Sequence, residues 1–85
     1  MDNKDRQEVL KRINEVSDCF YQNKINTGIS GMPELIKSLK EIIDRLPEEE
    51  QVVYYQHIKN LLEAYKTEDY IMTADILVYD ILEMI

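Results

Sequence analysis

Apolar residues recur every three or four positions along most of this 85-residue chain. This spacing places them on one side of an α-helix, because successive residues of an α-helix are turned by about 100°. Four stretches carry the pattern, and short polar runs or a proline separate them. The sequence therefore predicts four amphipathic helices that bury their apolar sides against one another in a single domain, residues 1–85.

The first two helices are predicted from long apolar stripes. The first helix should end at the polar run Gln22–Lys24. The second is expected to begin near Ser30, which places Pro33 in its first turn; a start near Asn26 should instead kink the helix at Pro33. The expected core residues are Val9, Leu10, Ile13, Val16 and Phe20 in the first helix and Ile29, Met32, Leu35, Ile36, Leu39, Ile42, Ile43 and Leu46 in the second.

Proline and acidic residues mark the start of the third helix. Pro47 disfavours helix at the residue before it and suits the opening of the next one, where the acids at 48–50 meet the positive end of the helix dipole. Lys66–Glu68 predicts a turn, and Asp69 an N-cap for the last helix. The expected core residues are Tyr54, Tyr55, Ile58, Leu61, Leu62 and Tyr65, then Tyr70, Ile71, Ala74, Leu77, Val78, Ile81, Leu82, Met84 and Ile85.

The lengths of the links predict the topology. Short links after the second and third helices favour antiparallel neighbours. The first link is looser, and the run Gly28–Gly31 is interpreted as a connector, because no phosphate-binding lysine follows it. The predicted fold is an all-α, up-and-down antiparallel four-helix bundle; the alternative is a three-helix core with a mobile first helix.

Charge is unevenly distributed along the chain. Residues 1–47 hold 8 acids and 8 Lys or Arg, whereas residues 48–85 hold 9 acids against Lys59 and Lys66. The second half would be repelled by phosphate backbones, so we expect no nucleic-acid binding. The acids either keep a small domain soluble or face a basic partner.

The chain has no segment typical of secretion or membrane insertion. Its N-terminus is charged, without the apolar core of a signal peptide, and the last helix is too short and too acidic for a membrane span. We therefore expect a cytoplasmic, reducing location, where the single cysteine, Cys19, is a structural thiol.

Residues suited to catalysis or ligand binding are sparse. His57 is the only histidine and is expected at the surface, and no Cys/His cluster predicts a zinc site. Asp75 with Asp80, and the acids at 48–50, lack the spacing of a carboxylate metal site. The tyrosines are expected mainly in core packing rather than in a ligand-binding box. We therefore expect no enzyme activity, no catalytic residue, no cofactor, no metal and no small-molecule ligand.

The last helix carries more large apolar residues than a core face requires. Met72, Ile76 and Tyr79 fall on its other side, at spacings of 4 and 3. Scattered apolar surface residues are common, but a stripe with an acidic rim is typical of a protein interface. The predicted interface consists of Met72, Ile76 and Tyr79, expected outside the core, with the flanking acids Asp75, Asp80 and Glu83. It would meet another protein or a second copy, most simply in a homodimer with antiparallel last helices.

The same segment resembles a known group of proteins. Its runs Asp69–Tyr70, Ala74–Leu77 and Tyr79–Leu82 are similar to the end of short helical proteins of Firmicutes, some of them encoded near motility genes. The resemblance covers mainly residues 60–85. It implies a cytoplasmic helical domain and supplies no catalytic residues.

Two functions fit these features. A protein-interaction module (an adaptor, chaperone or regulator) would bind through Met72, Ile76 and Tyr79 with weak salt dependence. The alternative is an acidic immunity protein or antitoxin that neutralises a basic toxin site, whose association would slow steeply as salt rises. An unrecognised enzyme is a distant third and would need a deep pocket enclosing His57 and several acids.

Overall fold

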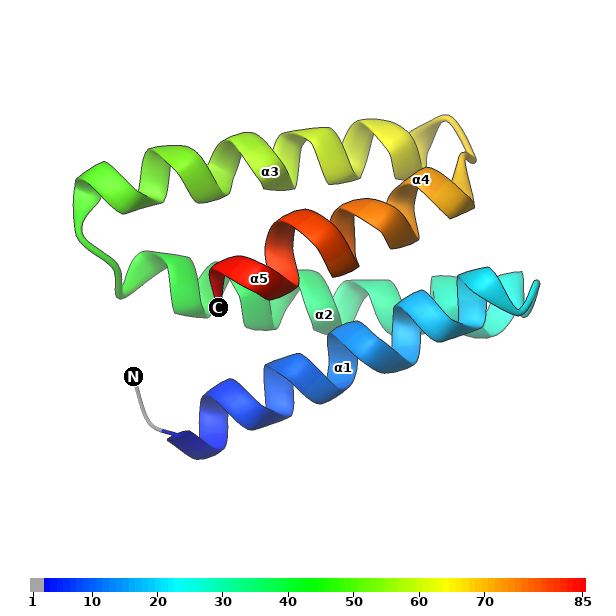
Figure 1. The fold of residues 1–85 in the computed structure, drawn as a ribbon, viewed down its shortest axis with the longest axis horizontal. Helices are drawn as coiled ribbons and strands as arrows, with labels where there is room; N and C mark the ends of the chain where they lie inside the picture. Colours follow the sequence, from blue (N-terminus) through cyan, green and yellow to red (C-terminus); the bar gives the residue numbers. More distant parts are fainter. Residues whose placement is uncertain (1–2) are drawn as a thin grey trace.

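Four helical rods lie side by side and alternate in direction (Figure 1). The structure is a computed structural model and describes residues 3–85. The first three rods are α1 (Asn3–Tyr21), α2 (Ile25–Asp44) and α3 (Glu48–Lys66). The last rod is continuous but has three parts: α4 (Tyr70–Asp75), the π-helix η1 (Ile76–Ile81) and α5 (Leu82–Met84). The predicted all-α, up-and-down four-helix bundle is confirmed.

The rods do not contact one another equally. α1 packs along α2 and also against the last rod, and α3 packs mainly against the last rod, whereas α2 and α3 touch over less of their length. α1 is a full member of the bundle, because its apolar stripe is buried. The core consists of Val9, Ile13, Val16, Phe20, Met32, Leu35, Leu39, Ile42, Ile43, Tyr54, Ile58, Leu61, Ala64, Ala74, Ile76, Leu77 and Ile81.

The start of α2 differs from the prediction. α2 begins at Ile25, so Pro33 lies inside the helix rather than in its first turn, and the run Gly28–Gly31 is helix rather than connector. A Cβ atom at Gly28 would lie 2.5 Å from Cε1 of Phe20. The glycine therefore permits the close packing of α1 on α2. Pro33 lies inside α2 without a backbone N–H to donate.

The ends of α1 and α3 have the same geometry. After α1, Asn23 has φ 61° and the Lys24 amide donates to the Cys19 carbonyl at 2.7 Å. After α3, Glu68 has φ 62° and the Asp69 amide donates to the Ala64 carbonyl at 3.0 Å. Both are left-handed C-terminal caps of the Schellman type. Asp69 then caps α4 as predicted, because its Oδ1 accepts the Met72 amide at 3.1 Å.

The π-helix changes which residues of the last rod face the core. A π turn holds more residues than an α turn, so the parts before and after η1 do not share the face that a constant 100° step implies. Ile71, predicted in the core, is 53% exposed, and Thr73 is fully buried. The Thr73 hydroxyl donates to the Asp69 carbonyl at 2.8 Å, so its burial leaves no unpaired donor.

Candidate protein-interaction surface

The predicted interface residues are not all outside the core. Met72 is 50% exposed and Tyr79 is 65% exposed, as expected. Ile76 is only 8% exposed and belongs to the core, so the prediction that it lies outside is wrong. Ile76 lies one turn after the fully buried Thr73, and the π-helix that begins at Ile76 keeps the later core residues Leu77 and Ile81 closer to its side of the rod than α-helical turns would. Asp75 and Asp80 are half-buried and Glu83 is exposed.

The predicted stripe is also divided between two sides of the last rod. Met72, Ile76 and Asp80 line a groove against α3, which we call the α3–α4 groove. Asp75 and Tyr79 face α1 instead. The Tyr21 hydroxyl donates to Oδ1 of Asp75 at 2.5 Å, and Tyr79 is close enough to influence the pKa of Tyr21.

Tyr21 therefore connects α1 to the last rod. Burial of its ring edge, followed by the hydrogen bond to Asp75, raises the pKa of Tyr21 from 10.0 to about 12. The phenol stays protonated and donates across the whole neutral range. This contact occupies Asp75, so Asp75 is less available to a partner than the other predicted acids.

The α3–α4 groove has an apolar floor and an acidic rim. Its volume is about 480 Å³. Ala64 and Ile76 form its deepest part, each 8% exposed, and Met72 lies beside them. The complete lining is Asn60, Glu63, Ala64, Thr67, Asp69, Met72, Ile76 and Asp80.

No lysine or arginine lines this groove. Asp69 caps α4, but Glu63 and Asp80 take part in none of the ion pairs between side chains of residues 4–85. These two carboxylates stand on opposite walls next to an apolar floor, with Lys59 and Lys66 near Glu63 on the outer face of α3. An arrangement of this kind suits a partner that brings both apolar and positively charged groups.

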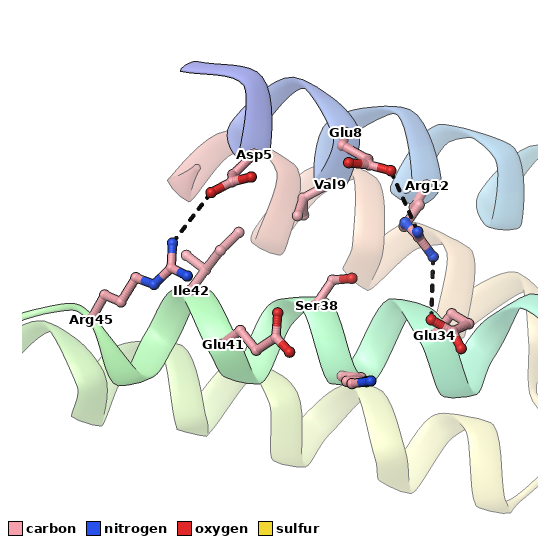
Figure 2. Close-up of a pocket in the computed structure, with 10 residues that line it drawn as sticks. Asp5, Glu8, Val9, Arg12, Glu34, Ser38, Glu41, Ile42 and Arg45 are labelled. Carbon is pink, nitrogen blue, oxygen red and sulfur yellow. Dashed lines mark hydrogen bonds and ion pairs between the residues drawn. The ribbon is translucent and has the colours of Figure 1, made fainter. Parts of the chain in front are cut away.

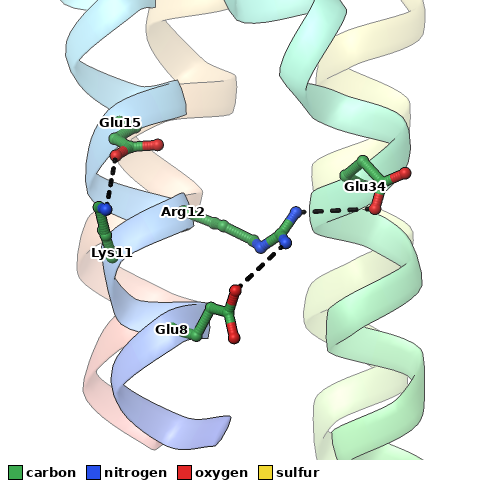
Figure 3. Close-up of polar contacts among 5 residues, drawn as sticks. All are labelled: Glu8, Lys11, Arg12, Glu15 and Glu34. Atoms are coloured by element: carbon green, nitrogen blue, oxygen red, sulfur yellow. Dashed lines mark ion pairs between the residues drawn. The ribbon is translucent and has the colours of Figure 1, made fainter. Parts of the chain in front are cut away.

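A second groove, the α1–α2 groove, is lined mostly by charged residues (Figure 2). Its volume is about 240 Å³, and Val9 and Ile42 lie beneath the charges. Arg45 lies 3.4 Å from Asp5, and Arg12 lies between two carboxylates, 3.5 Å from Glu8 and 3.6 Å from Glu34 (Figure 3). The charges in this groove largely neutralise one another.

The outer face of α3 carries apolar residues that the sequence analysis placed in the core. Tyr55 and Leu62 are exposed, and with Ile58, Lys59, Glu63 and Lys66 they line an open groove of about 360 Å³. The Tyr55 hydroxyl donates to Asp44 of α2 at 3.0 Å. The run Val52–Tyr55 could have indicated an exposed apolar face on α3, because four consecutive large residues cannot all face one side of a helix.

His57 and the acidic residues are the chain's candidates for catalysis or metal binding. His57 is half-buried rather than at the surface, its Nδ1 is buried without a partner, and it lines none of the three grooves above. Within residues 3–85, no group of three His, Cys, Asp or Glu residues is placed to hold a metal ion. None of the helices described here is both long and apolar enough to cross a membrane.

Two grooves of the bundle thus combine an apolar lining with acids outside the ion pairs of residues 4–85. One is the α3–α4 groove; the other, of about 460 Å³, is lined by Ile42, Leu46, Glu49, Glu50, Val53, Tyr54, Met84 and Ile85. Comparison with protein-family models, with curated proteins and with solved structures gives no match for this chain.

Proposed function

We propose that this protein is a non-enzymatic protein-interaction module that binds a partner through the exposed apolar residues of its last rod. One observation carries the proposal: Met72 and Tyr79 are large, apolar and at least half exposed on a rod that is also rimmed by acids. Burying such side chains against a partner is favourable, about 1.5–3 kcal/mol for each fully buried large residue.

The chemistry of the two residues suits this role. Methionine is flexible and polarisable, so Met72 can adapt to an irregular partner surface. Tyrosine offers a large ring with few rotatable bonds, so Tyr79 loses little conformational entropy on binding. Ile76 belongs to the core and adds a small apolar area to the floor of the α3–α4 groove.

A different protein fits the surface better than a second copy of this chain. In a homodimer with antiparallel last rods, the twofold axis would bring acids of one rod close to acids of the other. Asp80 and Glu83 have no cation among the ion pairs of residues 4–85, so that repulsion would not be offset within each subunit. The homodimer is tested below by sedimentation.

Affinity capture from an extract of the native host tests the proposal. The bait is the native protein, Met72→Asp, Tyr79→Asp or, as a matched control, Val52→Asp at an exposed apolar position on α3. We expect a protein that the native bait and the control retain and that both last-rod variants lose. Retention by all four baits, or loss with Val52→Asp as well, would contradict the proposal. Sedimentation equilibrium of the native protein measures self-association in parallel.

An acidic neutraliser remains the second candidate, because the excess of acids lies entirely in residues 48–85. Such a protein would bind through its charge rather than through Met72. Its association rate should fall steeply between low and high salt, and Met72→Asp should leave it unchanged or faster. An interaction module should show the reverse: a weak salt dependence and a large effect of Met72→Asp.

A further inference from the structure

We propose that the α3–α4 groove binds a basic amphipathic helix of another protein. This inference rests on the proposed function and names the chemical class of the partner. Three properties of the groove carry it: its length, its floor and its charge.

The groove is long enough for two turns of a helix. On the α3 side it extends from Asn60 to Thr67, eight residues, and the seven steps between them span about 10 Å at about 1.5 Å per residue. Both walls are helices whose backbone groups are used within the rods, so there is no sheet edge for an extended peptide to pair with. A third helix laid between two helices is the form of binding that this geometry permits.

The floor of the groove favours apolar side chains at helical spacing. Ala64 is small, so a partner helix can approach α3 closely there. Ile76 adds a branched apolar surface at the same depth, and Met72 extends it toward solvent. A partner residue and another four positions later on the same face can contact Ala64 and Ile76 together.

The rim of the groove selects positive charge on both sides of that apolar face. Glu63 stands on the α3 wall and Asp80 on the η1 wall, and no lysine or arginine lies in the lining. Acidic helices, nucleic acids and anionic membranes would all add negative charge to this rim and are disfavoured. Lysine or arginine flanking the apolar face would be attracted to both walls, most strongly to Asp80, because Lys59 and Lys66 already lie near Glu63.

The basic residues of this chain are poorly suited to the same groove. Helix α1 holds four basic residues, but it holds four acids as well and buries its apolar stripe in the bundle, so it cannot present that stripe elsewhere. The outer face of α3, with Tyr55 and Leu62 beside Lys59 and Lys66, has suitable chemistry. If this face entered the α3–α4 groove of a neighbouring copy, the assembly would be head-to-tail and would leave one free face and one empty groove at its ends. It would also bring together chains that each carry a net charge of −7. We therefore assign the groove to a different protein.

The test uses fluorescein-labelled synthetic peptides and fluorescence anisotropy. The probe is a peptide of about 15 residues with leucines on one helical face and lysines on both flanks of it. One control peptide has the same composition in an order that abolishes the apolar face, and a second has glutamate in place of lysine. We expect the probe to bind about tenfold more tightly than either control peptide, which corresponds to about 1.4 kcal/mol.

Matched variants of the protein locate the site. Met72→Ser, Glu63→Gln and Asp80→Asn should each weaken probe binding by about threefold or more. Val52→Ser changes another exposed apolar residue and Glu49→Gln another glutamate; both lie outside the groove and should leave the affinity unchanged. Backbone amide shifts in the NMR spectrum of the native protein should move at residues 60–67 and 72–80, and circular dichroism confirms that each variant is folded.

Three outcomes would overturn the inference. Equal binding of the scrambled peptide, or an effect of Glu49→Gln as large as that of Asp80→Asn, would mean diffuse charge attraction. Self-association that is lost both with Asp80→Asn and with Lys59→Gln would identify a second copy as the occupant. A captured partner that depends on Met72 and Tyr79 but is not displaced by the probe would leave the proposed function standing and refute only the basic helix.

Discussion

The α1–α2 groove and the α3–α4 groove both hold carboxylates, but only the α1–α2 groove also holds arginine and lysine. In the α1–α2 groove, Arg12 and Arg45 stand next to carboxylates and neutralise them. In the α3–α4 groove, Glu63 and Asp80 form none of the ion pairs of residues 4–85 and lie beside an apolar floor, with Lys59 and Lys66 near Glu63 only on the outer face of α3. The difference teaches that the number of acids in a region does not identify a binding surface; what matters is whether the fold already supplies their partners.

Close packing explains how one groove neutralises itself. Gly28 and Gly31 lack side chains where Phe20 and Val16 of α1 press against α2. With the two helices so near, long charged side chains on their outer edges can reach across, as Arg12 does to Glu34. The first half of the chain also holds equal numbers of acidic and basic residues, so its charges can be satisfied internally.

The largest expected effect on stability comes from a substitution in the floor of the α3–α4 groove. Ile76→Asp should lower the free energy of unfolding by about 3 kcal/mol, because it places a carboxylate in a core position without a partner. Tyr79→Asp, at a position that is 65% exposed, should change it by less than about 1 kcal/mol. Urea denaturation followed by circular dichroism measures both. Similar stabilities of the two variants would mean that Ile76 is not a core residue.

A second change breaks the contact that closes the α1–α2 side. Gly28→Ala should lower the free energy of unfolding by about 2 kcal/mol, because its Cβ would overlap the ring of Phe20. Alanine favours helix over glycine by about 1 kcal/mol, so a gain in stability would contradict the close approach. Thr27→Ala, next to it and exposed, is the control and should not be destabilising. Thermal and urea unfolding give the two values.

A third change leaves carboxylates of the α1–α2 groove without their cation, as in the α3–α4 groove. Arg12→Gln removes the cation that lies between Glu8 and Glu34. Because these ion pairs are at the surface, the free energy of unfolding should fall by less than about 1 kcal/mol. Lys11→Gln, which removes an exposed pair at 3.9 Å, is the control. A loss of several kcal/mol from Arg12→Gln would show that the groove depends on its ion pairs rather than on packing.

The smallest expected effect concerns pH. The pKa of Tyr21 is raised from 10.0 to about 12, first by burial and then by the hydrogen bond to Asp75. A raised pKa in the folded state means that the neutral phenol stabilises the fold below pH 10 and that this contribution is lost as pH rises through 12. Ultraviolet difference titration against Tyr21→Phe isolates this group. Asp75→Asn should lower the pKa of Tyr21, whereas Glu83→Gln should not; no change with Asp75→Asn would contradict the contact.

Much of the fold could be predicted because it depends on local pattern. The apolar stripes, Pro47 and the Asp69 cap each act within a few residues, so the four helices and their topology followed from them. The role of Gly28 could not be predicted in the same way, because only the ring of Phe20 in another helix distinguishes a packing glycine from a linker glycine.

The candidate surface was predictable only in part, for a related reason. The prediction that Met72 and Tyr79 lie outside the core was correct, whereas the same prediction for Ile76 was wrong. A π turn changes the angle between successive residues, and no single residue in the sequence signals it. The exposure of Tyr55 and Leu62 depends on how loosely α2 meets α3, which is a property of the assembled bundle. That Glu63 and Asp80 face one groove likewise follows from tertiary structure.

The contact between Phe20 and Gly28 also bears on the order of events during folding. These residues are only eight positions apart, so bringing them together closes a short loop at little entropic cost, whereas the last rod must find α1 across most of the chain. We therefore expect the α1–α2 hairpin to be formed in the folding transition state and the last rod to dock afterwards. Mutational φ-values near 1 at Val16 and near 0 at Leu77 would demonstrate this order. A protein that docks its binding rod last can couple recognition of a partner to completion of its own fold.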